Sequence, residues 1–210
     1  MIAIIDYKMG NVASVAKAFE LVGAQVSVTA DKRRLRKAKA LILPGVGAFA
    51  AAMKGLKKYD LEDTIKKVAE ENKPLLGICV GAQVFFTEGH EFGIHQGLGI
   101  IPGKVVRFQP SECHEKIPQV GWNSIFPPAG TAWSGTIFER LKPKDQLYFV
   151  HSYFFKPDNA NDILSITNYG GFEFCSAVKK GNVYGCQFHP EKSGNVGLSI
   201  IQDFIKIVDG

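Results

Sequence analysis

The amino-acid sequence predicts an α/β fold: an open, mostly parallel central sheet with flanking helices and added antiparallel strands. In the first half of the chain, short apolar runs alternate with amphipathic segments of helical period, which is typical of repeated strand–helix–strand units. In the second half, strand-like runs follow one another between Gly, Pro and Asn turns, which indicates hairpins added to that sheet. No internal repeat or linker interrupts the chain, so we expect one domain over residues 1–210.

The first half supplies the expected parallel strands and their helices. Ile2 to Ile5 is predicted as a buried strand and Val12 to Leu21 as an amphipathic helix. Asn11 is a suitable N-cap for that helix, and Gly23 is a suitable stop. The next expected elements are a strand at Gln25 to Thr29, a basic helix or turn, a strand at Ala40 to Leu43, helices at Ala48 to Leu56 and Leu61 to Glu71, and a strand at Pro74 to Cys79.

The second half is expected to be rich in strands and to end in a helix. The predicted strands cover Lys104 to Phe108, Gln146 to Phe155, Ile163 to Asn168, Ser176 to Lys179 and Val183 to Phe188. The last segment, Val196 to Val208, carries its apolar side chains on one side, as expected for a helix that closes over a sheet.

Composition excludes several classes of protein. With 210 residues, 46% of them hydrophobic and 21% charged, the chain is neither disordered nor a collagen or coiled coil. Its four cysteines form no CxxC pair, which suggests reduced thiols in a cytoplasmic protein. The first apolar run is too short for a signal peptide, and the longest uncharged stretch, Ile117 to Phe138, is broken by Pro and Gly, so no membrane span is expected.

Positive charge is concentrated in one segment, Lys32 to Lys39, although the net charge is only +5. Such a run is either a phosphate-contacting patch or a solvated connection. We favour the solvated connection because no aromatic residues are interleaved for stacking on bases, so neither a nucleic acid nor a membrane is an expected partner.

Cys79 lies between Gly77 and Gly81 at a predicted strand-to-helix turn, which is the nucleophile-elbow pattern with sulfur in place of oxygen. The glycines allow neighbouring backbones to approach and push the central residue into a strained conformation. A helix N-terminus beneath the sulfur would favour thiolate over thiol. The alternative is an inert buried cysteine at the end of an apolar strand.

His189 and Glu191 follow the last predicted strand and are separated by Pro190. In an extended stretch, side chains two positions apart project to the same side, so this spacing suits a base and the carboxylate that orients it. Without a nearby cysteine nucleophile, the pair would equally well be a surface histidine beside a solvated glutamate.

Pro44 to Ala48 form a Gly-rich strand exit whose backbone N–H groups could stabilise a developing oxyanion. The segment lacks the Lys-Ser/Thr of a phosphate-binding loop, so nucleotide binding is the weaker interpretation. A structural turn without a chemical role stays open.

At these residues the sequence resembles the class I glutamine amidotransferases, whose Cys-His-Glu triad lies in G-x-C-x-G and H-P-E motifs. The resemblance is closer to the glutaminase subunits of imidazole glycerol phosphate synthases. It covers the whole chain and is carried in order by Asp6 to Asn11, Pro44 to Phe49, Gly77 to Gln83, Lys116 to Asn123, His151 to Tyr153 and His189 to Ser193.

The resemblance implies hydrolysis of L-glutamine to glutamate and ammonia through a thioester on Cys79, with His189 and Glu191 completing the catalytic triad. It implies an oxyanion hole formed by the backbone N–H of Val80 and that of Val46 or Gly47. The implied glutamine-binding residues are Gln83, Tyr148, His151, Ser152 and Tyr153.

The resemblance also implies a heterodimer. The partner in this family is a (βα)8-barrel cyclase subunit, which receives the ammonia through a channel and uses it in histidine biosynthesis. The implied interface residues are Asn11, Pro118, Trp122 and Lys192. Two departures stand near that interface, because the family usually has Gly where Lys8 stands and His where Gln119 stands.

These departures leave room for a paralogue that supplies ammonia to a different barrel synthase, such as one that aminates a nucleotide sugar. A non-catalytic scaffold subunit and a cysteine hydrolase of another amide are further alternatives. No redox or nucleotide cofactor is expected. No metal is expected either, because the candidate ligands His90, His95, Cys113 and His114 match no standard zinc spacing.

Overall fold

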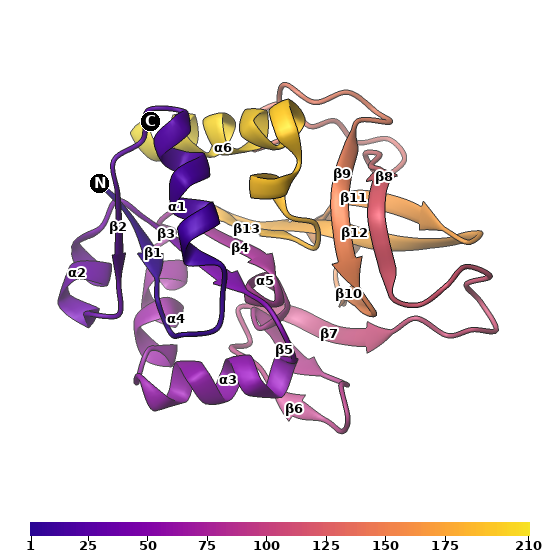
Figure 1. The fold of residues 1–210 in the computed structure, drawn as a ribbon, viewed down its shortest axis with the longest axis horizontal. Helices are drawn as coiled ribbons and strands as arrows, with labels where there is room; N and C mark the ends of the chain where they lie inside the picture. Colours follow the sequence, from indigo (N-terminus) through magenta and orange to yellow (C-terminus); the bar gives the residue numbers. More distant parts are fainter.

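Five parallel strands form the centre of the molecule in the computed structural model, which describes residues 1–210 (Figure 1). In spatial order they are β2 (Val26–Thr29), β1 (Ile2–Ile5), β3 (Ala40–Gly45), β4 (Leu75–Cys79) and β13 (Val183–Cys186). All residues of β1, β3, β4 and β13 are buried, which explains their continuous apolar sequences. The expected mostly parallel sheet is confirmed.

The same sheet continues beyond β13 as a set of mainly antiparallel strands. In spatial order these are β12 (Phe172–Lys180), β10 (Tyr153–Pro157), β7 (Ile101–Arg107), β5 (Phe86–Gly89) and β6 (His95–Gln96), while β11 (Ile163–Tyr169) pairs with β12. The connection from β11 to β12 and that from β12 to β13 are antiparallel hairpins, as predicted. The short strands β5 and β6 have no counterpart in the sequence prediction.

A separate two-stranded ribbon crosses β11 and β12 of the main sheet and packs against them (Figure 1). It pairs β8 (Gln119–Ser124) with β9 (Gln146–His151) in antiparallel fashion. The prediction of one strand from Gln146 to Phe155 is therefore wrong. The strand is interrupted at Ser152, where the His151 Nδ1 lies 2.7 Å from the Tyr153 carbonyl oxygen. The chain then enters the main sheet as β10, which pairs with β7.

Helices cover both faces of the parallel strands. In Figure 1, α1 (Val12–Leu21) and α6 (Gly194–Asp209) lie above the sheet, whereas α2 (Lys32–Lys37), α3 (Phe49–Lys58) and α4 (Glu62–Glu70) lie below it. Phe19 of α1 and Phe204 of α6 pack edge to face, with ring centroids 6.3 Å apart. The Asn11 side chain accepts a hydrogen bond from the Ser14 N–H at 3.2 Å, so the predicted N-cap is confirmed.

The basic segment forms the helix α2, and its charged side chains are exposed while Leu35 faces the core. This arrangement matches a solvated helix face. A further short helix, α5 (Val80–Gln83), follows β4 directly, and two 3₁₀ turns, η1 (Ala160–Asp162) and η2 (Pro190–Lys192), complete the elements. None of the helices is both long and apolar enough to cross a membrane.

One hydrophobic core extends from Ile2 to Phe204 on both sides of the sheet. Because β3, β4 and β13 run parallel and adjacent, their carboxyl ends lie at the same edge. Ligands of open α/β sheets bind at such an edge, which here brings together the segments that follow Gly45, Cys79 and Cys186.

Candidate active site

Cys79 occupies a strained turn between β4 and α5. Its backbone has φ +53° and ψ −118°, a region that residues with a side chain rarely adopt. A Cβ on Gly77 would lie 2.6 Å from the Ala82 Cα, and one on Gly81 would overlap the Leu43 carbonyl oxygen. Both glycines are therefore required for close packing, and the predicted elbow geometry is confirmed.

The turn presents the Cys79 sulfur to a cavity while most of the side chain is buried. Val80 is the first residue of α5, so its N–H has no acceptor within the helix and remains available to a ligand beside the sulfur. The other three cysteines are buried away from this cavity, and burial raises the pKa of the Cys175 and Cys186 thiols.

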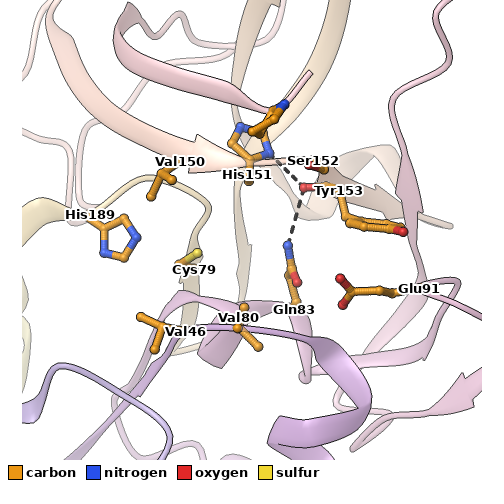
Figure 2. A pocket seen from close by; sticks show the side chains of 12 residues that line it. Val46, Cys79, Val80, Gln83, Glu91, Val150, His151, Ser152, Tyr153 and His189 are labelled. Carbon is orange, nitrogen blue, oxygen red and sulfur yellow. Dashed lines mark hydrogen bonds between the residues drawn. The ribbon is translucent and has the colours of Figure 1, made fainter. Parts of the chain in front are cut away.

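His189 and Glu191 form a buried pair next to Cys79. The His189 Nδ1 is 2.8 Å from the Glu191 Oε1, and the two side chains are 3% and 2% exposed. A carboxylate only accepts hydrogen bonds, so when the ring is neutral its proton lies on Nδ1 and its lone pair on Nε2. The Nε2 atom is buried without a hydrogen-bond partner, and the ring lies beside the Cys79 sulfur (Figure 2).

The contact between His189 and Glu191 arises differently from the prediction. The expected extended stretch ends at His189, and Pro190 begins the 3₁₀ turn η2. Proline suits the first position of a helical turn because its nitrogen has no hydrogen to satisfy there. The turn brings the Glu191 carboxylate back to the imidazole.

The environment of His189 favours its protonated form. Burial alone would lower its pKa, but the Cys79 sulfur and the Glu191 carboxylate beside the ring outweigh this effect and raise the pKa to about 9. A base with a raised pKa accepts a proton from a neighbouring thiol readily. Cys79 and His189 can therefore exist together as a thiolate and an imidazolium.

A cavity of about 410 Å³ opens beside the sulfur, a size suited to a small metabolite. Its lining consists of Val46, Gly47, Cys79, Val80, Gln83, Glu91, Pro118, Val150, His151, Ser152, Tyr153 and His189. Figure 2 shows Cys79 and His189 at one end and Glu91 at the other. The cavity thus combines a nucleophile and base at one end with a carboxylate at the far end.

Of the two N–H groups suggested from the Gly-rich strand exit, one is already bonded. The Val46 N–H donates to the Met9 carbonyl oxygen at 3.2 Å, whereas Gly47 donates no backbone hydrogen bond and has φ +87°. In this conformation Gly47, together with Val80, is the better candidate for binding an oxyanion.

Four of the five predicted glutamine-binding residues line the cavity: Gln83, His151, Ser152 and Tyr153. Tyr148 does not line it. On the face of the ribbon that also carries Val150, the Tyr148 ring contacts Trp122, with centroids 6.2 Å apart, and lies 5.8 Å from the Lys192 Nζ.

His151 has a structural place in the cavity wall. Its Nδ1 lies 2.7 Å from the Tyr153 carbonyl oxygen, and its Nε2 lies 2.9 Å from the Gln119 side-chain amide. Burial lowers the pKa of His151 to about 4, so the ring is neutral at pH 7. The wall opposite His189 therefore contributes hydrogen-bonding groups without a positive charge.

Of the predicted interface residues, only Pro118 lines this cavity. Trp122 is 53% exposed on β8, and Lys192 is exposed on η2. Asn11 begins α1, which contacts η2.

The two departures from the family pattern have different surroundings. Lys8 is exposed with φ +66°, a conformation that suits glycine, and it pairs with Asp6 at 2.7 Å. Gln119 is buried against His151 rather than lying on the outer surface. Only Lys8 therefore offers its side chain to a partner.

Two residues of the site were missed by sequence reasoning. Gln187 is fully buried and donates a hydrogen bond from Nε2 to the Cys79 sulfur at 3.7 Å. Its position two residues before His189, on the same segment, is a signal that could have been used. Glu91 lies in the connection from β5 to β6, and no local pattern marks it.

The side chains considered as metal ligands do not converge. His90 pairs with Glu88 at 2.7 Å, and Cys113 donates to the Tyr169 carbonyl oxygen at 3.4 Å. No group of three His, Cys, Asp or Glu side chains is close enough to hold a metal ion.

Comparison with known proteins agrees with the geometry. The model of the family "Glutamine amidotransferase class-I" matches residues 3–208. The chain is 46% identical to the imidazole glycerol phosphate synthase subunit HisH of Sulfurimonas denitrificans over 98% of both chains. It is 44% identical to HisH 1 of Legionella pneumophila strain Lens, over 98% of this chain and 99% of that one.

Among solved structures, PurLQS from Thermotoga maritima has the same fold, with a TM-score of 0.75 at 20% identity, covering 98% of this chain and 97% of that one. A structure described as a glutamine amidotransferase also superposes with a TM-score of 0.75, at 19% identity and over 100% and 99% of the two chains. The chain therefore belongs to the class I glutamine amidotransferases. Within that class, its full-length relatives place it with the HisH subunits of imidazole glycerol phosphate synthase.

Proposed function

We propose that this chain is the glutaminase subunit of an imidazole glycerol phosphate synthase, with Cys79, His189 and Glu191 as its catalytic triad. The observation that carries the assignment of roles is the buried, unpartnered Nε2 of His189, which lies beside the Cys79 sulfur while Nδ1 is held by Glu191 at 2.8 Å. This arrangement can take the thiol proton and keep the resulting imidazolium stable.

In the first half of the reaction, the Cys79 thiolate attacks the side-chain amide carbon of L-glutamine. The carbonyl oxygen becomes an oxyanion, which the N–H groups of Val80 and Gly47 stabilise. The intermediate then collapses to a glutamyl thioester. Ammonia leaves with the proton that His189 carries.

In the second half, His189 acts as a base toward water. The water oxygen attacks the thioester carbon, the carbon–sulfur bond breaks, and glutamate leaves. The proton taken from water returns to the sulfur or remains on His189 as the ion pair. Glu191 keeps the imidazole in one orientation through both halves.

The far end of the cavity suits the amino-acid end of the substrate. Glu91 is the only carboxylate that lines the cavity, and Figure 2 shows it at the end away from Cys79. Its negative charge complements an α-ammonium group. The Glu91 Oε2 also accepts the Phe49 N–H at 2.7 Å, which fixes the carboxylate at the start of α3. Glutamine would thus lie with its amide at Cys79 and its ammonium group at Glu91.

The ammonia is delivered to a (βα)8-barrel cyclase subunit that docks over the cavity mouth. Val120 and Trp122 of β8 project to the same side as Val150 of β9, and these side chains are 59%, 53% and 38% exposed. Such an exposed apolar surface favours a protein partner. Asn11 and Lys192 supply polar groups at its rim. This assignment places the protein in the cytoplasm and in histidine biosynthesis, without a nucleic-acid or membrane partner.

The experiment is to measure glutamate release from L-glutamine by the chain alone and mixed with the histidine-pathway barrel subunit and its phosphoribosyl ligand. Stimulation by that mixture, lost in Cys79→Ala, is the expected result. If only a different barrel synthase stimulates the chain, the amidotransferase chemistry stands and the pathway is another one. If Cys79→Ala still releases glutamate, the thioester mechanism falls.

A further inference from the structure

The Cys79 sulfur receives one side-chain hydrogen bond in this structure, and it comes from Gln187 rather than from the triad. The Gln187 Nε2 is 3.7 Å from the sulfur, and the whole residue is buried. Its backbone is fixed as well, because the Gln187 N–H donates to the Ser176 carbonyl oxygen at 2.9 Å. The amide approaches the sulfur from the protein interior, since Gln187 is absent from the cavity lining.

A glutamine amide can face a neighbour with either its oxygen or its nitrogen, so the direction of this hydrogen bond needs an independent argument. The Tyr153 carbonyl oxygen provides one, because a backbone carbonyl can only accept. It lies 3.4 Å from the Gln83 Nε2, which requires the Gln83 amide to turn its nitrogen that way (Figure 2).

The same Gln83 nitrogen lies 3.0 Å from the Gln187 side chain, which must therefore present its oxygen. Once the Gln187 oxygen faces Gln83, its nitrogen faces Cys79. The orientation of both amides is thus set by one main-chain carbonyl two residues after His151, and the hydrogen bond at the sulfur is a donated one.

We propose that Gln187 is a positioning residue for the nucleophile: its N–H, oriented through Gln83 by the Tyr153 carbonyl, holds the Cys79 sulfur and stabilises its thiolate form. This proposal rests on the assignment of Cys79 as nucleophile. A donor beneath a mostly buried sulfur offsets part of the cost of carrying negative charge there. The Gln187 amide contacts the sulfur from the protein interior, so the side of the sulfur that faces the cavity stays free for substrate.

The test is the pH dependence of alkylation of Cys79 by iodoacetamide in the full chain, with Cys79→Ser as the blank for the three other thiols. In Gln187→Leu the donor is lost, so the midpoint of the pH–rate profile should move upward by about one pH unit. Gln187→Glu keeps the shape of the side chain but replaces the donor, so it should move the midpoint in the same direction.

The matched control is Ser165→Ala, which removes a buried hydrogen bond of the same sheet, 2.8 Å between the Ser165 and Ser176 hydroxyls, without touching the sulfur. Its midpoint should equal that of the parent chain. The proposal is overturned if a Gln187 variant with native near-ultraviolet circular dichroism keeps the parent midpoint, or if Ser165→Ala shifts it equally.

The role of Gln83 is tested by a double-mutant cycle. Gln83→Leu removes the group that orients Gln187, so it should shift the midpoint less than Gln187→Leu, and the double variant should match Gln187→Leu. If the shifts of the two single variants in the alkylation midpoint add up in the double variant, Gln83 acts independently of Gln187. That result would overturn the proposal that Gln83 orients Gln187. Alkylation needs neither glutamine nor a partner subunit, so a failed glutaminase assay and a failed positioning role give different results.

Discussion

At the scale of single residues, the site depends on which atoms of a side chain are already bonded. The Nδ1 of His189 is bonded to Glu191, so only Nε2 can exchange a proton with Cys79. Both ring nitrogens of His151 already have hydrogen-bond partners. This second histidine of the cavity is therefore part of the cavity wall and is not available as a base. Two histidines in one cavity thus have separate tasks because their partners differ.

The carboxylate of Glu191 can be tested against a second Glu–His pair of the same spacing. Glu191→Gln removes the negative charge that stabilises the imidazolium, so the rate of glutamate release with the partner subunit should fall about 100-fold or more. The control is Glu88→Gln, because Glu88 pairs with His90 at 2.7 Å at the surface. Its rate should stay near the parent rate, and equal losses in both variants would contradict the role of Glu191.

His151 should make folding stability depend on pH in a defined window. Its pKa is lowered by burial to about 4, against 6.5 in the unfolded chain, so between these values the unfolded state binds a proton that the folded state does not. Stability should therefore be complete above pH 6.5 and fall by about 3 kcal/mol as the pH drops toward 4.

The measurement is urea unfolding at pH 7.5 and at pH 4.5, for the parent chain and for His151→Gln. Other acid-sensitive groups are common to both proteins, so their effects cancel in the difference. The variant should lose less stability than the parent on acidification. An identical loss would show that His151 carries its proton equally in both states.

At the scale of elements, the elbow from β4 to α5 combines a strained residue with two close backbone contacts. A Cβ on Gly81 would overlap the Leu43 carbonyl oxygen of β3, so neither element can move aside independently. The strain at Cys79 persists because the packing of α5 on β3 and β4 holds the turn closed.

Gly81→Ala should lower the free energy of unfolding by about 3 kcal/mol. The control is Gly130→Ala, where φ is +75° and the space around the new methyl group is open, so strain alone should cost about 1 kcal/mol. Urea unfolding followed by circular dichroism measures both values. Equal costs would mean that α5 shifts freely and that the close contact is unimportant.

The sequence predicts the first half of the fold well, because β1, β3 and β4 are buried on both faces and carry continuous apolar runs. The predicted strand at Ala40 to Leu43 needs only Pro44 and Gly45 to match β3. The second half is less predictable. The run from Gln146 to Phe155 is mostly apolar. The turn that divides it is closed by the His151 side chain, which no periodicity reveals.

The site shows the same division. Cys79, His189 and Glu191 are marked by local motifs whose spacing has a physical meaning. Gln187 and Glu91 acquire their places only when distant segments meet, one against the end of β4 and the other at the start of α3. Tyr148 does not line the cavity although Val150, on the same face of β9, does, because the Tyr148 ring packs against Trp122 instead.

At the scale of the whole molecule, the reactive groups and the surface proposed for docking lie at the same edge of the sheet. Val150 and His151 of β9 line the cavity, together with Pro118 just before β8. The ribbon of β8 and β9 also exposes Val120 and Trp122. A partner that covers the ribbon would also cover the cavity mouth and would thereby keep ammonia from solvent.

Trp122→Ala should weaken binding of the barrel cyclase subunit by about 10-fold to 100-fold, because exposed aromatic anchors dominate protein interfaces. Titration calorimetry with the purified subunit measures the dissociation constant. Leu21→Ala is the control, since Leu21 is 71% exposed at the far end of α1. The interface lies elsewhere if Leu21→Ala weakens binding, or if Trp122→Ala leaves the dissociation constant unchanged.

The interlocked glycines limit how this sequence can change over generations. A Cβ on Gly45 would meet the Gly81 nitrogen and lie 2.8 Å from the Tyr7 hydroxyl, and Gly77 is confined by α5. Replacing any one of these glycines therefore requires a second backbone segment to move. A single substitution at these positions is thus expected to disrupt the turn at Cys79. The exposed side chains of the ribbon, Val120, Trp122 and Val150, have no such restriction. Descendants of this chain can exchange their protein partner by changing surface side chains while the glutamine chemistry stays as it is.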